Sequence, residues 1–175
     1  MQPQIRWQWT RFDDLEPRHL YALLRARTEV FIIEQHCAFL DTDGVDLNAW
    51  HLLGWVEPRP TSDRADRALP VLAAYLRLIE PGRIYAEASI GRVLTVAPFR
   101  RVGLGRPLMK EGLRKAAELH PGHAVRIGAQ IRLERFYQSL GFHTVSDIYI
   151  EDGIEHVQML RPADAGDSRL RPAAS

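Results

Sequence analysis

A short segment combines glycines and arginines in a pattern that could bind phosphate. It lies between a β-rich run, 90–96, and a stretch with helical periodicity, and it contains Arg100, Arg101, Gly103, Gly105 and Arg106. A turn that leads into a helix points several unpaired backbone N–H groups at one place, which attracts an anion. Glycine lets the backbone approach a ligand closely, and arginine supplies countercharge. We therefore expect a local anion site here.

Two common phosphate motifs do not fit this segment. A dinucleotide fingerprint requires a further glycine three residues after Gly105, where Leu108 stands. A P-loop requires lysine followed by serine or threonine after its glycines, and the segment has neither. The remaining alternative is an ordinary strand-to-helix turn with surface arginines.

Three aspartates lie close together at Asp41, Asp43 and Asp46, with Gly44 among them. They resemble half of a calcium loop, but the glycine comes too early and no glutamate completes the ligand set. We expect a solvated surface loop, and the alternative is that its charge attracts a cationic amine.

The single cysteine, Cys37, excludes an internal disulfide and a multi-cysteine zinc cluster, and we expect a small buried hydrophobe there.

Hydrophobic periodicity predicts the elements that must position these residues. Apolar side chains recur at three- and four-residue spacing from 15 to 31, with Pro17 suited to a first turn, which is typical of an amphipathic helix. The dipeptide Asp152-Gly153 between two extended runs favours a type I′ hairpin turn. The further expected elements are strands at 51–56, 71–79, 90–96 and 125–129, helices at 107–119 and 133–140, and the hairpin within 142–160. This order predicts a mixed α/β sheet.

Composition limits the class of protein. The chain has 175 residues, 46% of them hydrophobic, which fits one domain, expected over 1–161. A formal net charge of +1 gives no overall field for nucleic acid or an anionic membrane. The N-terminus lacks an apolar run suited to secretion or membrane insertion, so a cytoplasmic location is expected. The proline-rich insert at 57–70 is expected to be an exposed connection, and the tail at 162–175 to be disordered.

Two motifs in order resemble the GNAT superfamily of acyl-CoA dependent N-acyltransferases. Its pyrophosphate loop has glutamine or arginine, two residues, glycine, one residue, and glycine or alanine, which Arg100, Gly103 and Gly105 match. Its next landmark is a short helix that carries a tyrosine and ends in Gly-Phe, matched by Tyr137 and Gly141-Phe142. The segments 27–35, 41–46, 51–55 and 151–154 further resemble the ElaA-type branch. The resemblance spans roughly 9–161 and implies a central, mostly antiparallel sheet flanked by helices.

The resemblance implies an N-acetyltransferase that moves an acetyl group from acetyl-CoA directly to a primary amine within a ternary complex. A backbone N–H near Leu94 to Val96 would stabilise the oxyanion, and the pantetheine arm would pair with that strand. Gln130 stands where the superfamily often has asparagine, so its reach toward the arm differs. The implied cofactor-binding residues are Leu94, Thr95, Val96, Arg100, Arg101, Val102, Gly103, Leu104, Gly105, Arg106, Gln130 and Tyr137.

The catalytic residues are less defined by the sequence. Tyr137 is the candidate general acid for the leaving thiolate, although its spacing to Leu133 and Leu140 fits a core aromatic equally well. The strand before the glycine loop contains no acid, so the general base is open between Glu34, Glu87, His51 and a water chain. For His51, hydrogen bonding at the start of a strand is the competing interpretation.

Three functions remain open at this stage. The first is acetyl transfer to a small-molecule or peptide amine, with no metal, nucleic acid or membrane involved, and with strand edges that would allow a homodimer. The second is acyl-homoserine lactone synthase-like acyl transfer, which would need a docking surface for an acyl carrier protein. The third is a non-catalytic acyl-CoA binding module. The acceptor amine has no signature in the sequence.

Overall fold

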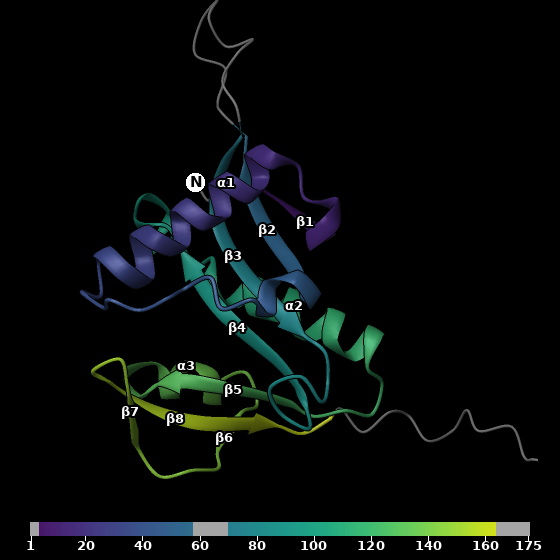
Figure 1. The fold of residues 1–175 in the computed structure, drawn as a ribbon. Helices are drawn as coiled ribbons and strands as arrows, with labels where there is room; N and C mark the ends of the chain where they lie inside the picture. The colour runs from purple at the N-terminus through teal and green to yellow at the C-terminus, as the bar shows by residue number, and fades with distance from the viewer. Residues whose placement is uncertain (1–3, 58–69, 164–175) are drawn as a thin grey trace, which may run out of the picture.

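The computed structural model describes residues 4–57 and 70–163, and they form one mixed sheet with helices on both of its faces (Figure 1). The strands follow the order β1-β2-β3-β4-β5-β8-β6, and β7 also pairs with β8. Every pairing is antiparallel except that of β4 with β5. The predicted insert at 57–70 and tail at 162–175 lie almost wholly outside the described residues. The strands are β1 Ile5–Arg11, β2 Trp50–Val56, β3 Val71–Ile79, β4 Ala88–Thr95, β5 Val125–Gln130, β6 His143–Thr144, β7 Tyr149–Glu151 and β8 Ile154–Arg161.

The predicted fold class is confirmed, with one strand that sequence analysis missed. The edge strand β1 pairs along its whole length with β2. Its signal was present, because Ile5, Trp7 and Trp9 alternate with polar residues as in a half-buried strand. The predicted hairpin turn is confirmed, since Asp152 and Gly153 both have positive φ, 50° and 79°, as a type I′ turn requires.

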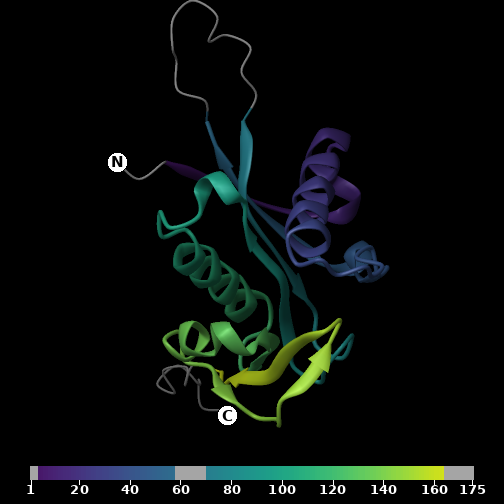
Figure 2. The same ribbon diagram turned by 90° about the vertical axis from the view of Figure 1, so that its left-hand side faces the viewer.

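The helices lie in two layers, with α1 on one face of the sheet and α2 and α3 on the other (Figure 2). Helix α1, Pro17–Arg27, continues as a π-helical segment, Thr28–Ile33. Helix α2, Gly105–Leu119, begins two residues earlier than predicted. The predicted helix at 133–140 is shorter, with a 3₁₀ turn, Ile131–Leu133, followed by α3, Glu134–Gln138. In the described part of the chain, no helix is long and apolar enough to cross a bilayer.

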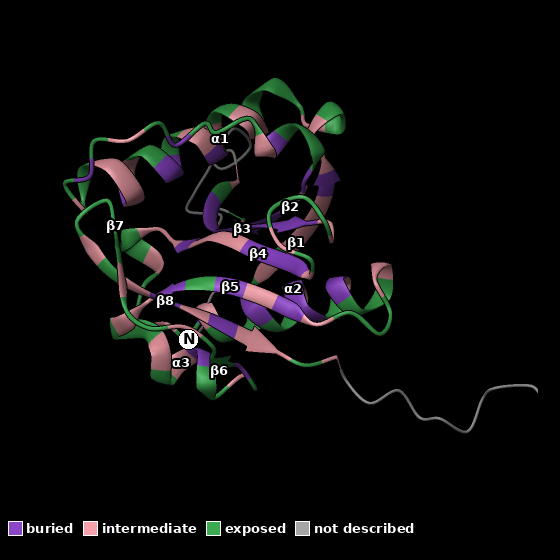
Figure 3. Ribbon diagram, turned by 60° about the horizontal axis from the view of Figure 1, so that its bottom comes forward, coloured by how far each residue is buried: buried purple, intermediate pink, exposed green. Residues whose placement is uncertain are grey.

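The sheet separates two apolar clusters, and its central strands are buried on both faces (Figure 3). On the α2 side, Leu76 and Ile90 pack with Leu108, Met109 and Leu113 of the helix, among others. The cluster on the α1 side consists of Leu23, Ala26, Val30, Leu53, Trp55, Leu72, Tyr75 and Leu94. Strands that are buried on both faces hold their register firmly, because a slip by one residue exchanges the two sets of side chains.

Helix α2 approaches the sheet closely at Gly112, and this contact gives a test of the packing. A Cβ at Gly112 would lie 2.8 Å from Leu76 Cδ2 and 3.2 Å from Ile90 Cδ1, and both side chains are buried. Alanine gains about 1 kcal/mol in helix propensity, but overpacking costs about 1–3 kcal/mol. Gly112→Ala is therefore expected to lower the free energy of unfolding by up to about 2 kcal/mol, measured by urea denaturation. Lys110→Ala, on the exposed side of α2, should change it by less than about 0.5 kcal/mol, and equal stability of the two variants would contradict the packing.

Candidate functional site

Strands β4 and β5 separate soon after they meet, which leaves part of β4 with an unpaired edge (Figure 1). They pair only at Ala88 with Val125 and at Ser89 with Arg126. Strand β4 continues to Thr95, and no other described strand pairs with this side of it beyond Ser89. Unpaired N–H and C=O groups along such an edge can accept an extended ligand as an added strand. We call the region where the two strands diverge the β4–β5 wedge.

The glycine loop predicted from sequence follows the end of β4 and leads into α2. Arg101 and Gly103 have positive φ, 62° and 85°, so the backbone folds tightly between strand and helix. The first turn of α2 has no side-chain cap at Leu104 and no acidic residue. Its first N–H groups are therefore available to an anion, and the helix dipole favours one. The geometry agrees with the predicted phosphate loop.

The three arginines of this loop have different environments. The guanidinium of Arg100 donates from Nε to the carbonyl oxygen of Thr95 at 2.9 Å and from Nη2 to Glu34 at 2.5 Å. Arg106 donates to the carbonyl oxygen and the hydroxyl of Ser139, at 3.3 and 2.8 Å. Arg101 is exposed and makes no hydrogen bond or ion pair with the described residues. Hydrogen bonds of Arg100 thus connect the loop to the end of β4, and those of Arg106 connect it to the turn after α3.

A basic pocket of about 630 Å³ continues from the loop along the outer side of α2. Four of its lining residues are cationic and none is acidic. Arg106 is shared between the pocket and the loop, so a ligand with several phosphates could contact both. The lining consists of Arg106, Lys110, Leu113, Arg114, Ala117, Ser139, Leu140 and Arg161.

Tyr137 lies in α3 on the same face of the sheet as α2, and it is 6% exposed. Its ring packs against Phe136 and Phe142, with centroids 5.1 and 5.9 Å away. Burial raises the pKa of its phenol to about 12, so the hydroxyl keeps its proton at neutral pH. The side chain fits both a core aromatic and a proton donor.

Gln130 lies at the end of β5, on the far side of the wedge from Thr95. Its side-chain amide donates to Gln35 Oε1 at 3.1 Å and accepts from Arg132 Nε at 2.9 Å. The thiol of Cys37, buried as predicted, lies 3.3 Å from the carbonyl oxygen of Asp152. The segment after α1 therefore contacts both β5 and the β7–β8 turn.

The two candidate carboxylates lie in different surroundings. Glu34 is about one-third exposed and bonds Arg100, next to the end of β4. Glu87 accepts two hydrogen bonds from Arg126, at 3.0 and 2.7 Å, and these bonds lower the pKa of its carboxyl group. Of these two carboxylates, Glu34 contacts the glycine loop, through its bond with Arg100.

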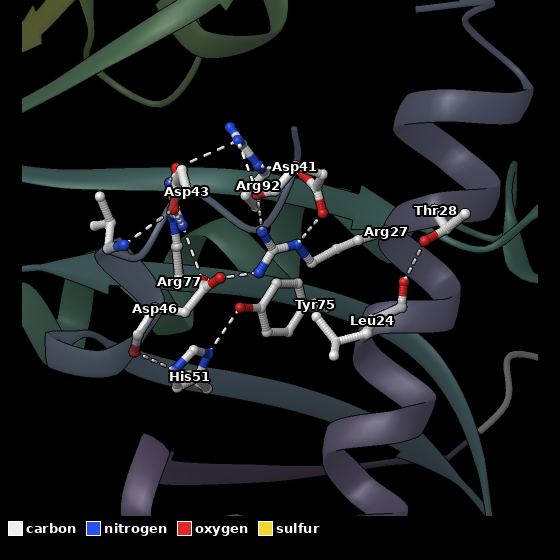
Figure 4. A network of polar contacts seen from close by, with 11 residues as sticks. Leu24, Arg27, Thr28, Asp41, Asp43, Asp46, His51, Tyr75, Arg77 and Arg92 are labelled. Atoms are coloured by element: carbon white, nitrogen blue, oxygen red, sulfur yellow. Dashed lines mark hydrogen bonds and ion pairs between the residues drawn. The ribbon is translucent and has the colours of Figure 1, made fainter. Parts of the chain in front are cut away.

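The acidic segment is not the solvated surface loop that its composition suggested, because Asp41 and Asp46 are buried (Figure 4). Arg27 of α1 is completely buried and donates to Asp41 Oδ2 at 2.7 Å and to Asp46 Oδ1 at 2.8 Å. Arg77 of β3 donates to Asp43 and Asp46. The sequence held a signal for this arrangement, since position 27 continues the apolar stripe of α1, where a charged residue needs a buried partner.

These ionic contacts keep the segment charged in the folded protein. Burial opposes ionisation of Asp43, but the hydrogen bond and charge of Arg77 outweigh it and lower the pKa to about 2. Arg92 of β4 completes the set with Asp41 Oδ1 at 2.7 Å and Asp43 Oδ2 at 3.4 Å. We call Arg27, Asp41, Asp43, Asp46, Arg77 and Arg92 the arginine–aspartate network.

His51 is completely buried beside this network, and both of its ring nitrogens are occupied. Nε2 lies 3.0 Å from the carbonyl oxygen of Asp46, and Nδ1 lies 2.8 Å from the Tyr75 hydroxyl. Because a carbonyl only accepts, Nε2 carries the proton, and Nδ1 accepts from Tyr75. Burial lowers the pKa of the imidazole, which favours the neutral ring. The geometry matches the hydrogen-bonded core histidine and leaves no ring nitrogen for an amine.

The buried imidazole predicts a pH dependence of stability. Its pKa is depressed in the folded state, so below about pH 6.5 the unfolded chain binds a proton that the folded chain does not. The free energy of unfolding should therefore fall as the pH decreases below 6.5, by up to about 1.4 kcal/mol per pH unit. Urea denaturation at pH 5 and pH 7.5 measures this slope.

The contribution of His51 can be isolated by substitution. His51→Gln keeps an amide that can donate and accept but cannot ionise, so the variant should lose this part of the slope. The matched control is His143→Gln, because His143 is exposed on β6. An unchanged slope in His51→Gln would contradict the assignment.

Comparison with known proteins agrees with this geometry. The family model described as an acetyltransferase (GNAT) domain matches residues 64–161. A UPF0039 protein of Synechocystis is 39% identical over 90% of this chain and 95% of its own length. Protein ElaA of Escherichia coli is 36% identical over 90% of this chain and 96% of its own, and its crystal structure has a TM-score of 0.77. An acyl-CoA N-acyltransferase from Pseudomonas aeruginosa has a TM-score of 0.79 at 38% identity, covering 90% of this chain and 99% of that one.

Proposed function

The chain belongs to the GNAT acetyltransferase family, and we propose that it is an N-acetyltransferase that uses acetyl-CoA to acetylate a primary amine in a ternary complex. One observation carries the proposal: the free edge of β4 in the β4–β5 wedge leads, through a 3₁₀ turn at Ala97–Phe99, into a glycine loop at the uncapped N-terminus of α2. An extended amide-containing arm that ends in a pyrophosphate suits this combination, and coenzyme A has that chemistry.

Each part of the site has a role in holding the co-substrate. The free edge at Leu94 to Val96 would pair with the pantetheine arm, and Gln130 faces it from the end of β5. The loop from Arg100 to Arg106 would hold the pyrophosphate by backbone N–H groups. The basic pocket would take the 3′-phosphate end, since Lys110 and Arg114 line it farther along α2 than Arg106, and Arg161 lines it from β8.

The reaction forms a C–N bond to the acetyl carbon and breaks the C–S bond. The amine nitrogen must attack as a neutral group and then lose a proton. A backbone N–H on the free edge of β4 would stabilise the negative charge on the carbonyl oxygen. Burial keeps the phenol of Tyr137 protonated, and this phenol would donate its proton to the departing thiolate.

Glu34 is the base that the geometry favours. It is partly exposed, and Arg100 links it to the carbonyl oxygen of Thr95, beside the expected reaction centre. His51 has no free ring nitrogen, and Glu87 is engaged twice by Arg126. The acceptor would be a small-molecule or peptide amine, and we place the activity in the cytoplasm.

Release of free thiol from acetyl-CoA in the presence of a panel of amines tests the function. We expect amine-dependent release by the unaltered protein. Binding of CoA without release would instead indicate a non-catalytic module, and release only from an acyl carrier protein would indicate the synthase-like activity.

Gly103→Ala should raise the KM for acetyl-CoA at least about tenfold, because alanine resists the positive φ that the loop requires.

The matched control is Gly122→Ala. Gly122 has a similar φ of 79°, but it lies in the α2–β5 turn with open space around it. Its substitution should carry a similar backbone cost without changing the KM. Equal KM values in both variants would remove the loop from the binding site.

Two substitutions test the proton transfers. Tyr137→Phe and Glu34→Gln should each lower kcat about 10²- to 10⁴-fold while acetyl-CoA binding changes little, because general acid–base catalysis acts on the transition state. Glu87→Gln should leave kcat within about twofold if Glu34 is the base. Steady-state kinetics at saturating acetyl-CoA and amine measure these values. Unchanged turnover in either variant would exclude that residue from the mechanism.

A further inference from the structure

Arg92 adopts a backbone conformation that is unfavourable for a residue with a side chain. Its φ is 51°, in the left-handed region, although it lies in the middle of β4. Opposite it, the register between β3 and β4 shifts: Arg77 pairs with Gly91, and Tyr75 pairs with Leu94. Two residues of β4 thus face Leu76 alone, which defines a β-bulge. A side chain in this conformation persists only where its surroundings hold it there.

The bulge decides which way the following residues of β4 point. Ile90 packs on the α2 side of the sheet, and in a regular strand Leu94 would lie on that same side. Instead, Val93 packs on the α2 side and Leu94 on the α1 side. Because side chains and backbone N–H groups alternate together along a strand, the bulge also sets which N–H groups of Leu94 to Val96 face the β4–β5 wedge.

The side chain of Arg92 is held from several directions (Figure 4). Its guanidinium donates to Asp41 Oδ1 at 2.7 Å and to the carbonyl oxygen of Asp41 at 3.4 Å, and it also bonds Asp43. It lies over the rings of Phe31 and Phe39, with centroids 5.9 and 5.5 Å away. Asp41 and Asp43 are themselves held by Arg27 and Arg77. The acidic segment therefore provides a rigid anchor for this one residue of β4.

We propose that Arg92 is a positioning residue, whose contacts with Asp41 and Asp43 hold the β4 bulge and thereby aim the Thr95 N–H into the wedge. The neighbouring Val96 N–H donates to the carbonyl oxygen of Ala73 in β3 at 3.0 Å, and because N–H groups alternate along a strand, that of Thr95 points to the opposite side. The inference rests on the proposed function for its catalytic consequence. The structural part, that the arginine–aspartate network fixes the conformation of β4, does not depend on turnover. In this arrangement the acidic segment acts through the strand that holds the co-substrate, rather than by attracting the amine.

Hydrogen exchange tests the structural part. Arg92→Ala removes the anchor and keeps a Cβ in the left-handed conformation, so peptides covering residues 93–96 should exchange at least about tenfold faster, while those of β2 stay unchanged. The matched control is Arg11→Ala in β1, which also removes an ion pair, with Glu80, and a cation–π contact, with Trp50. Unchanged exchange at 93–96 in Arg92→Ala would overturn the proposal. If Arg92→Ala does not fold, the same exchange comparison is made with Arg92→Lys, which keeps a positive charge but lacks the guanidinium that bonds Asp41 and Asp43.

A comparison of glycine with alanine tests the catalytic part. Both variants lose the guanidinium, but only glycine adopts the positive φ without strain. We expect kcat to fall about 10- to 100-fold in Arg92→Ala and several-fold less in Arg92→Gly. Equal losses in the two variants would mean that the guanidinium acts directly, and would overturn the positioning role. Absence of thiol release by the unaltered protein would refute the proposed function alone, because the exchange comparison still decides the structural claim.

Discussion

The burial of the Arg27 guanidinium is the constraint on which one half of this structure depends. A charge that is removed from water must be paired and hydrogen bonded, or folding would lose several kcal/mol. Asp41 and Asp46 pair with this guanidinium, so the acidic segment after α1 packs against the folded protein and does not extend into solvent. Arg77 and Arg92 then share the same carboxylates, which connects α1, the acidic segment, β3 and β4 through ionic contacts.

The other half of the site depends on the sheet. Strands β4 and β5 run parallel, pair at two positions and then diverge. Helix α2 packs closely, through Gly112, on the face of the sheet opposite α1. The divergence leaves the edge of β4 open, and the glycine loop brings the N-terminus of α2 to the end of that strand. In the proposed function, the backbone edge of β4 holds the reacting end of the co-substrate, and no charged side chain is required there. The two halves meet in β4, at the irregular residue Arg92, whose side chain bonds the acidic segment.

Much of the fold follows from local patterns in the sequence. Periodicity located α1, α2, β2, β3 and β5 to within a few residues, and the Asp152-Gly153 turn was specified by its two residue types. The misplaced features were non-local. Asp41 and Asp43 look like an exposed loop until Arg27, Arg77 and Arg92, which lie 14 to 51 residues away in the chain, supply their partners. The edge strand β1 was missed although its alternation was visible.

The sequence by itself located the glycine turn that precedes α2 and predicted that it binds phosphate, because Gly103 and the residues around it act through local backbone geometry. It also indicated the family, through Tyr137 and Gly141-Phe142 at their spacing from that loop. Only the tertiary structure decided the surroundings of the remaining candidates. It placed His51 in the core, joined Glu34 to Arg100, and fixed the bulge at Arg92. The physical reason is that burial, ion pairing and strand register depend on which distant segments the fold brings together.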